Sequence, residues 1–197
     1  MINKAIDYIE KIFAGDGSGH DFDHTMRVYR MAVRIAEEEG ARQDIVALAA
    51  LLHDVDDRKL SPQTCANKDR AVGFLRNNNM DEDTIKRIVQ VISEISFSEG
   101  NGEPSSVEGK CVQDADRLDA IGAIGIGRAF AFGGSRGRRM HDPECVDATS
   151  TIQHFYDKLL LLKERMNTAT GSRLAAGRDV FLRSFLDEFY AEWDGIR

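Results

Sequence analysis

The chain has 197 residues, 42% of them hydrophobic and 30% charged, with a formal net charge of −7 and an isoelectric point near 5.3. This length and composition suit one compact domain with a single core. The acidic charge argues against partners that attract proteins through general electrostatics, such as long nucleic acids or anionic lipid surfaces. A small anionic substrate stays compatible, because a local cluster of arginines can override the average field of the surface.

The first expected element is an amphipathic helix from Met1 to Phe13, which lacks the uninterrupted apolar core of a signal peptide. No segment is long and apolar enough to span a bilayer. The three cysteines, Cys65, Cys111 and Cys145, are widely spaced and odd in number, so we expect reduced thiols and no disulfide framework or zinc ribbon. These observations predict a cytoplasmic protein without membrane partners.

Helical periodicity continues along most of the chain. Apolar residues recur at three- and four-residue spacing in the segments 28–35, 45–52 and 85–92. The segment from Val146 to Trp193 is typical of two amphipathic helices separated near residues 168–172, and glycine-, asparagine- and proline-containing stretches interrupt the pattern elsewhere. We therefore predict an all-α fold with a single domain spanning residues 1–197.

Four polar residues stand out against this apolar pattern. His53 and Asp54 end the apolar helical run 45–52, His24 follows a polar helix start at residues 21–23, and Asp116 flanks an apolar stripe in the segment 112–119. A carboxylate buried without compensation costs several kcal/mol, and a cation would compensate it. One divalent ion explains all four residues together, whereas the alternative needs four unrelated buried polar groups. The sequence thus predicts a metal site formed by His24, His53, Asp54 and Asp116.

These residues resemble the pattern of the HD-domain metal-dependent phosphohydrolases, which is a His, then a His-Asp doublet, then an Asp in an Ala-Asp-Arg/Lys context. Flanking segments extend the resemblance to small stand-alone bacterial HD hydrolases of the YpgQ and YedJ type over nearly the whole chain; they are 19–21, 27–29, 114–122 and 154–160. The resemblance implies an α-helical domain that hydrolyses phosphate esters or anhydrides. We expect a metal-site core at about 20–125, with late helices at 146–194 packing on it.

The ligand set also predicts the kind of metal. Members of the family with two metals carry further histidines between the doublet and the last aspartate, and this chain has none there, so we expect one divalent ion per chain. Two imidazoles and two carboxylates suit Mn²⁺, Fe²⁺, Co²⁺ or Ni²⁺, with Mg²⁺ less favourable because of the nitrogen ligands. We expect Mn²⁺.

The resemblance also implies a carboxylate that assists the attacking water. Asp57, four residues after His53, occupies that position, and Asp56 is the competing candidate for general acid/base. His20, one turn before His24, is a candidate for protonating the leaving oxygen or holding a phosphate.

A glycine- and arginine-rich segment, 128–139, has no acidic residue and is predicted to be a flexible basic loop that wraps a polyphosphate. A solvated surface role remains the alternative for these arginines. The predicted substrate-binding residues are Arg27, Arg136, Arg138, Arg139, Lys158 and Arg178.

The predicted function is therefore metal-dependent hydrolysis of a small phosphorylated metabolite, and the expected metabolite is a nucleotide. The resemblance implies cleavage of a nucleoside triphosphate to monophosphate and pyrophosphate; nucleoside monophosphate dephosphorylation and cyclic-nucleotide phosphodiester cleavage are alternatives with the same chemistry. A metal-containing nucleotide-binding regulatory module is the alternative outside the enzymes. A homodimer is left open, because the aromatic stripe Phe181, Phe185, Phe189 and Trp193 is either core or a dimer face.

Overall fold

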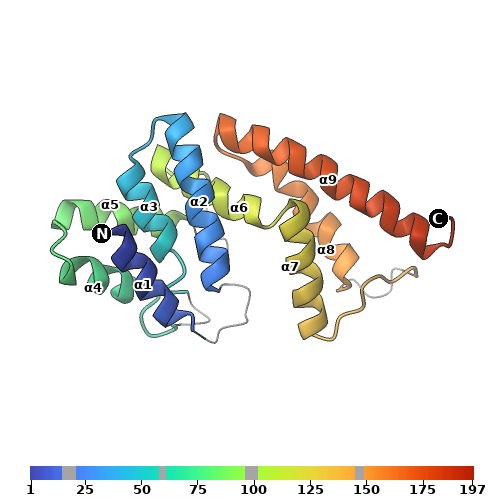
Figure 1. The fold of residues 1–197 in the computed structure, drawn as a ribbon, viewed down its shortest axis with the longest axis horizontal. Helices are drawn as coiled ribbons and strands as arrows, with labels where there is room; N and C mark the ends of the chain where they lie inside the picture. The colour runs from blue at the N-terminus through green and yellow to red at the C-terminus, as the bar shows by residue number, and fades with distance from the viewer. Residues whose placement is uncertain (15–20, 58–60, 96–101, 145–148) are drawn as a thin grey trace. The chain divides into compact units, whose positions relative to one another are not determined.

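A computed structural model describes residues 1–14, 21–57, 61–95, 102–144 and 149–197 (Figure 1). Within these ranges every regular element is helical and no strand occurs, so the predicted all-α fold is confirmed. The chain forms two compact units, Met1–Asp116 and Arg117–Arg197, which are described separately. No helix among the described residues combines the length and apolar character needed to cross a membrane.

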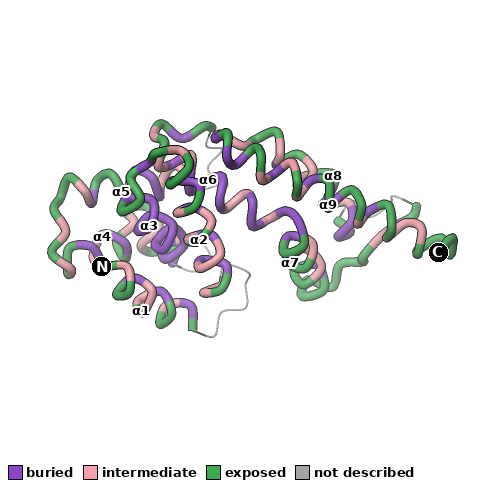
Figure 2. Tube along the Cα trace, turned by 45° about the horizontal axis from the view of Figure 1, so that its top comes forward, coloured by how far each residue is buried: buried purple, intermediate pink, exposed green. Residues whose placement is uncertain are grey.

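The first unit is built around α3 (Gln43–Leu52), whose residues 45–52 are all buried. A helix that is apolar on every side needs neighbours on several sides. It packs against three of them, namely α1 (Ile2–Ile12), α2 (Phe22–Glu39) and α5 (Glu82–Ile95). Figure 2 shows α3 as an almost continuous buried stretch of the trace. The end of α3 is therefore held rigidly, and this is where the His53-Asp54 pair begins.

The remaining helices of this unit are α4 (Asp69–Asn77), which packs against α5, and α6 (Val107–Asp119), whose last residues belong to the second unit. Two long-range hydrogen bonds anchor α6: Gln113 donates from Nε2 to the carbonyl of Glu94 at 3.2 Å, and the Arg42 amide donates to Glu108 at 3.2 Å. Residues Val112 and Ala115 of α6 are buried, as the predicted apolar stripe requires.

The second unit contains α7 (Gly122–Ser135), α8 (Thr151–Asp157), two short 3₁₀ turns, η2 (Leu159–Leu161) and η3 (Lys163–Arg165), and the long α9 (Ala169–Trp193). The α9 helix packs against α7 and η3. Rings from three helices form the aromatic core of this unit: Phe130, Phe155, Phe185 and Phe189. Phe185 and Phe189 of the predicted aromatic stripe are thus partly buried in this ring cluster, whereas Phe181 is 51% exposed and Trp193 43% exposed.

Two predictions about local structure are wrong. The segment expected to be a basic loop is helical as far as Ser135, because contacts of the partly buried Phe130 with other rings offset the low helix propensity of the nearby glycines. The segment before Thr168 is not a single amphipathic helix. The apolar run 159–162 forms 3₁₀ turns instead, and these place the buried Leu159 and Leu162, three residues apart, on one side.

Candidate metal centre

His53 is positioned by the last turn of α3. It follows Leu52 directly, and its Nδ1 lies 2.8 Å from the carbonyl oxygen of Ala50. Because a carbonyl can only accept a hydrogen bond, Nδ1 carries the proton, and in the neutral ring Nε2 keeps a lone pair directed away from the helix. A carbonyl that orients a histidine in this way is typical of metal-binding sites. The role of Ala50 is not predicted from the sequence, where its position three residues before His53 in a helix is the one signal for it.

His24 is positioned by the first turn of α2. The side chain of Asp21 caps this helix by accepting a hydrogen bond from the His24 amide at 2.7 Å, as the sequence predicts for a polar helix start. The His24 ring is fully buried and lies edge-on to the His53 ring, with 5.6 Å between centroids. Two imidazoles from helices far apart in the sequence therefore meet inside the first unit.

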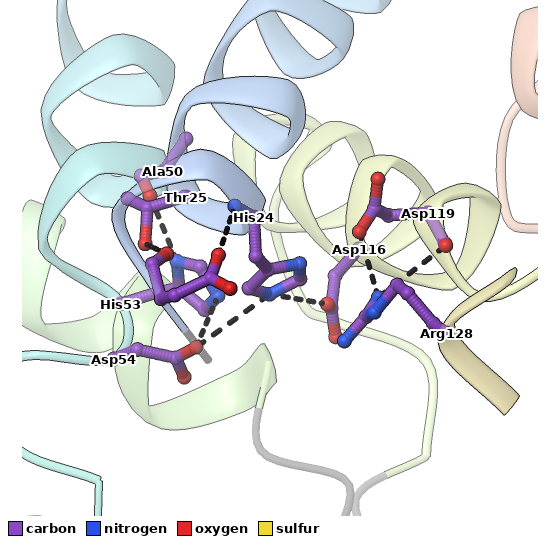
Figure 3. A network of polar contacts seen from close by, with 9 residues as sticks. His24, Thr25, Ala50, His53, Asp54, Asp116, Asp119 and Arg128 are labelled. Carbon is purple, nitrogen blue, oxygen red and sulfur yellow. Dashed lines mark hydrogen bonds and ion pairs between the residues drawn. The ribbon is translucent and has the colours of Figure 1, made fainter. Parts of the chain in front are cut away.

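Two carboxylates complete the group (Figure 3). Oδ2 of Asp54 lies 3.2 Å from Nε2 of His53 and 3.6 Å from Nε2 of His24. Oδ1 of Asp116, on α6, lies 3.5 Å from Nε2 of His24. The structure therefore brings together all four residues that the sequence predicts as metal ligands.

These separations fit ligands around one ion better than hydrogen bonds. Contacts of 3.5 and 3.6 Å are too long for hydrogen bonds. Two ligand atoms bound at about 2.1 Å to the same ion lie about 3.0–3.5 Å apart when the angle between them is near 90–110°. The donor atoms of His24, His53 and Asp54 lie within 4.8 Å of one another, and all three residues are buried. The residues present thus fit a divalent transition-metal ion.

The electrostatics of this group favour a positive charge. Burial alone lowers the pKa of His53, but the charge and hydrogen-bonding capacity of Asp54, the charge of Asp116 and the Ala50 carbonyl outweigh burial and raise the pKa to about 9. The two negatively charged carboxylates therefore stabilise a nearby cation, which can be a proton on the imidazole or a metal ion.

The acidic residues next to these candidate ligands have different surroundings. Asp56 is fully buried, and its two carboxylate oxygens accept hydrogen bonds from the amides of Arg70 and Ala71 at 3.2 and 2.9 Å. Asp57 is partly exposed, and its own amide donates to the Asp54 carbonyl at 3.0 Å. Of the two candidates for acid/base, Asp57 has the side chain with access to solvent. The third candidate, His20, lies outside the described residues.

The carboxylate of Asp119, in contrast, is compensated by an arginine of the same chain. The sequence places it three residues after Asp116, and in the second unit its Oδ2 lies 2.7 Å from Nη1 of Arg128 (Figure 3). The Asp119 side chain is 6% exposed and that of Arg128 29% exposed, so the pair is largely shielded from water. Arg128 thus compensates a buried carboxylate, a role that the sequence does not predict because Arg128 falls at the start of the expected basic loop.

The predicted substrate-binding residues occupy several positions. Arg27 is partly buried on α2 in the first unit. In the second unit, the guanidinium carbons of Arg136 and Arg138 each lie 5.4 Å from the centroid of the Phe132 ring, and Arg139 pairs with Asp142 at 3.1 Å. Lys158 ends α8, and Arg178 donates to the Leu118 carbonyl while its stem covers Gly122. Contact of these residues with substrate stays a prediction.

Comparison with known proteins agrees with this geometry. The family model described as "HD domain" matches residues 21–121. The uncharacterized protein YpgQ of Bacillus subtilis (strain 168) is 38% identical over 192 residues, covering 96% of this chain and 92% of YpgQ. The uncharacterized protein L803 of Acanthamoeba polyphaga mimivirus is 30% identical over 183 residues, covering 73% of this chain and 75% of L803.

Solved structures are similar along nearly the whole chain. An HD-superfamily hydrolase from Bacillus thuringiensis has a TM-score of 0.84 at 40% identity, covering 98% of this chain and 96% of that one. The crystal structure of B. subtilis YpgQ in complex with ADP has a TM-score of 0.85 at 35% identity, covering all of both chains. The family match spans His24, His53, Asp54 and Asp116, and we conclude that the chain belongs to the HD-domain family and has the fold of the HD-superfamily hydrolases.

Proposed function

We propose that this protein is a metal-dependent phosphohydrolase that cleaves nucleoside triphosphates to monophosphates and pyrophosphate. The observation that carries the proposal is the convergence of His24, His53, Asp54 and Asp116 inside the first unit, at separations suited to a single ion. Similarity to an HD-superfamily hydrolase supports the reaction class. The similar YpgQ protein, whose structure contains ADP, supports a nucleotide as the ligand.

The ligand set would hold Mn²⁺ or a similar ion, which supplies Lewis acidity for the bound water and the phosphoryl group. The residues of the chain supply the rest. His53 keeps its Nε2 lone pair available through the bond from Nδ1 to Ala50. Asp57 is partly exposed and lies three residues after Asp54. We propose that it accepts the proton of the attacking water, a role that raises the rate by about 10²–10⁴ for a well-placed base.

The arginines are proposed to neutralise the phosphates. Arg136 and Arg138 are exposed, and the guanidinium carbon of each lies over the ring of the half-exposed Phe132, 5.4 Å from its centroid. The ring thus holds two guanidinium groups close together. Guanidinium forks match phosphate oxygens geometrically, so this pair suits a ligand with several phosphate oxygens.

The experiment that tests this proposal is a screen for phosphate and pyrophosphate release from nucleoside mono-, di- and triphosphates with Mn²⁺, Mg²⁺ and Co²⁺. We expect pyrophosphate from triphosphates, highest with Mn²⁺, and none from a His53→Ala/Asp54→Ala protein. An Asp57→Asn protein should still bind the ion but lose at least about 100-fold in turnover. Nucleotide binding without release under any metal would refute the hydrolase proposal in favour of a regulatory module.

A further inference from the structure

The turn that carries Asp54 is attached to a helix later in the sequence by one buried side chain. Asp56 is two residues after Asp54 and is fully buried. Its Oδ1 accepts from the amide of Arg70 at 3.2 Å and its Oδ2 accepts from the amide of Ala71 at 2.9 Å. Each oxygen of the carboxylate is thus engaged by a backbone amide in the first turn of α4.

These bonds replace a cap that α4 lacks locally. The N-cap residue, Lys68, has a left-handed backbone with φ 55° and ψ 42° and makes no side-chain capping bond. The first amides of a helix have no partner within it, and a nearby Ser, Thr, Asp or Asn ordinarily supplies one. Here the partner is Asp56, which lies 14 and 15 residues before the two amides. Hydrogen bonds therefore join the start of α4 to the turn that follows α3.

The same turn contains further short connections. The Asp57 amide donates to the Asp54 carbonyl at 3.0 Å, and the Ser61 hydroxyl donates to the Val55 carbonyl at 3.2 Å. Because Asp54 lies inside this hydrogen-bonded turn, the direction of its carboxylate depends on the anchoring of the turn. Asp56 connects this turn to amides that lie 14 and 15 residues further along the chain.

We propose that Asp56 is a positioning residue for the metal centre, which holds the Asp54 turn against α4 and takes no part in proton transfer. The inference rests on the proposed metal site. This role for Asp56 leaves Asp57 as the candidate for general acid/base, since the Asp56 oxygens accept hydrogen bonds from backbone amides inside the protein and Asp57 retains access to solvent.

The test is the affinity of purified protein for Mn²⁺, measured by electron paramagnetic resonance well below the melting temperature. In Asp56→Asn, one oxygen remains but an amide nitrogen faces a backbone donor, so we expect the dissociation constant to rise about 10- to 100-fold, as for other residues that orient metal ligands. The matched control is Asp81→Asn, because Asp81 caps α5 by accepting from the Thr84 amide at 2.9 Å. This control should leave the dissociation constant unchanged.

A second pair of variants leaves Asp56 itself in place. Arg70→Pro removes the amide that donates to Oδ1 at a position in the first helical turn, where proline is tolerated, and Arg70→Ala controls for loss of the exposed side chain. We expect weaker Mn²⁺ binding in the proline variant than in the alanine variant. Should Asp56→Asn fail to fold, this pair decides the question alone.

The outcomes separate this inference from the proposed function. An Asp56→Asn protein that binds Mn²⁺ like the wild type but has lost turnover would overturn the inference and make Asp56 the acid/base. Unchanged binding together with a lower melting temperature would overturn it in favour of a purely structural cap. If the wild type binds Mn²⁺ without hydrolysing any nucleotide, the hydrolase proposal fails while the binding measurements still decide the role of Asp56.

Discussion

Competition between protons and metal at His53 gives a quantitative prediction. A metal ion needs the neutral imidazole, whereas the carboxylates of Asp54 and Asp116 raise the pKa of His53 to about 9 in the metal-free protein. At pH 7 the ring is then neutral in about 1% of molecules, so apparent affinity for Mn²⁺ should be about 100-fold below its limit at high pH. The apparent dissociation constant should fall about tenfold per pH unit between pH 7 and 8.5.

The free energy of unfolding of the metal-free protein should fall as the pH rises, whereas the affinity for Mn²⁺ increases. The folded pKa of His53, about 9, lies above the value of 6.5 for an unperturbed histidine, so the protonated ring stabilises the folded state fully below pH 6.5. The shift corresponds to about 3 kcal/mol, which is lost as the pH rises from 6.5 through 9. Saturating metal should remove this loss, since the ion then takes the place of the proton.

The assay is a Mn²⁺ titration followed by electron paramagnetic resonance at pH 6.5, 7.0, 7.5, 8.0 and 8.5 under anaerobic conditions, with denaturant unfolding of the metal-free protein at the same pH values. Asp54→Asn serves as a comparison in the unfolding series, because removing that charge should lower the pKa of His53 and flatten the pH dependence of stability. A dissociation constant that does not change over this pH range would contradict competition between the proton and the metal ion at His53.

Three further predictions concern the packing that surrounds the site. Arg128→Met leaves the buried Asp119 carboxylate without its guanidinium, so we expect a loss of about 2–3 kcal/mol in denaturant unfolding; a loss below about 1 kcal/mol, as for exposed pairs, would contradict the argument. Gly125→Ala should destabilise the protein, because the new Cβ would lie 2.2 Å from the Ala120 carbonyl oxygen. Gly127→Ala, whose Cβ would have nothing within 4 Å, should raise the free energy of unfolding by about 0.5–1 kcal/mol. Thermal melts in which both variants shift the melting temperature in the same direction would contradict this prediction. Burial and neighbouring carboxylates raise the pKa of Cys111 to about 12, so peptide mass spectrometry should find it unmodified by iodoacetamide at pH 8 until the protein unfolds.

Much of the architecture follows from local sequence patterns. The three- and four-residue apolar spacing predicts α2, α3 and α5, and the polar residues before His24 predict the start of α2, which the structure places at Phe22 with Asp21 as its cap. The pattern failed at α7 and before α9. In the first case contacts of Phe130 with rings from later helices decide the conformation, and a local propensity scale contains no such term.

The residue types of the candidate site are predictable from the amino-acid sequence, because the order and context of His24, His53, Asp54 and Asp116 distinguish these imidazoles and carboxylates from others in the chain. The partners of the neighbouring carboxylates, in contrast, are visible only in the folded chain. Asp56 meets amides 14 and 15 residues away, and Asp119 meets a guanidinium nine residues away. Such partners depend on how helices pack, because burial and hydrogen-bond geometry are properties of the folded chain that neighbouring residues in the sequence do not specify.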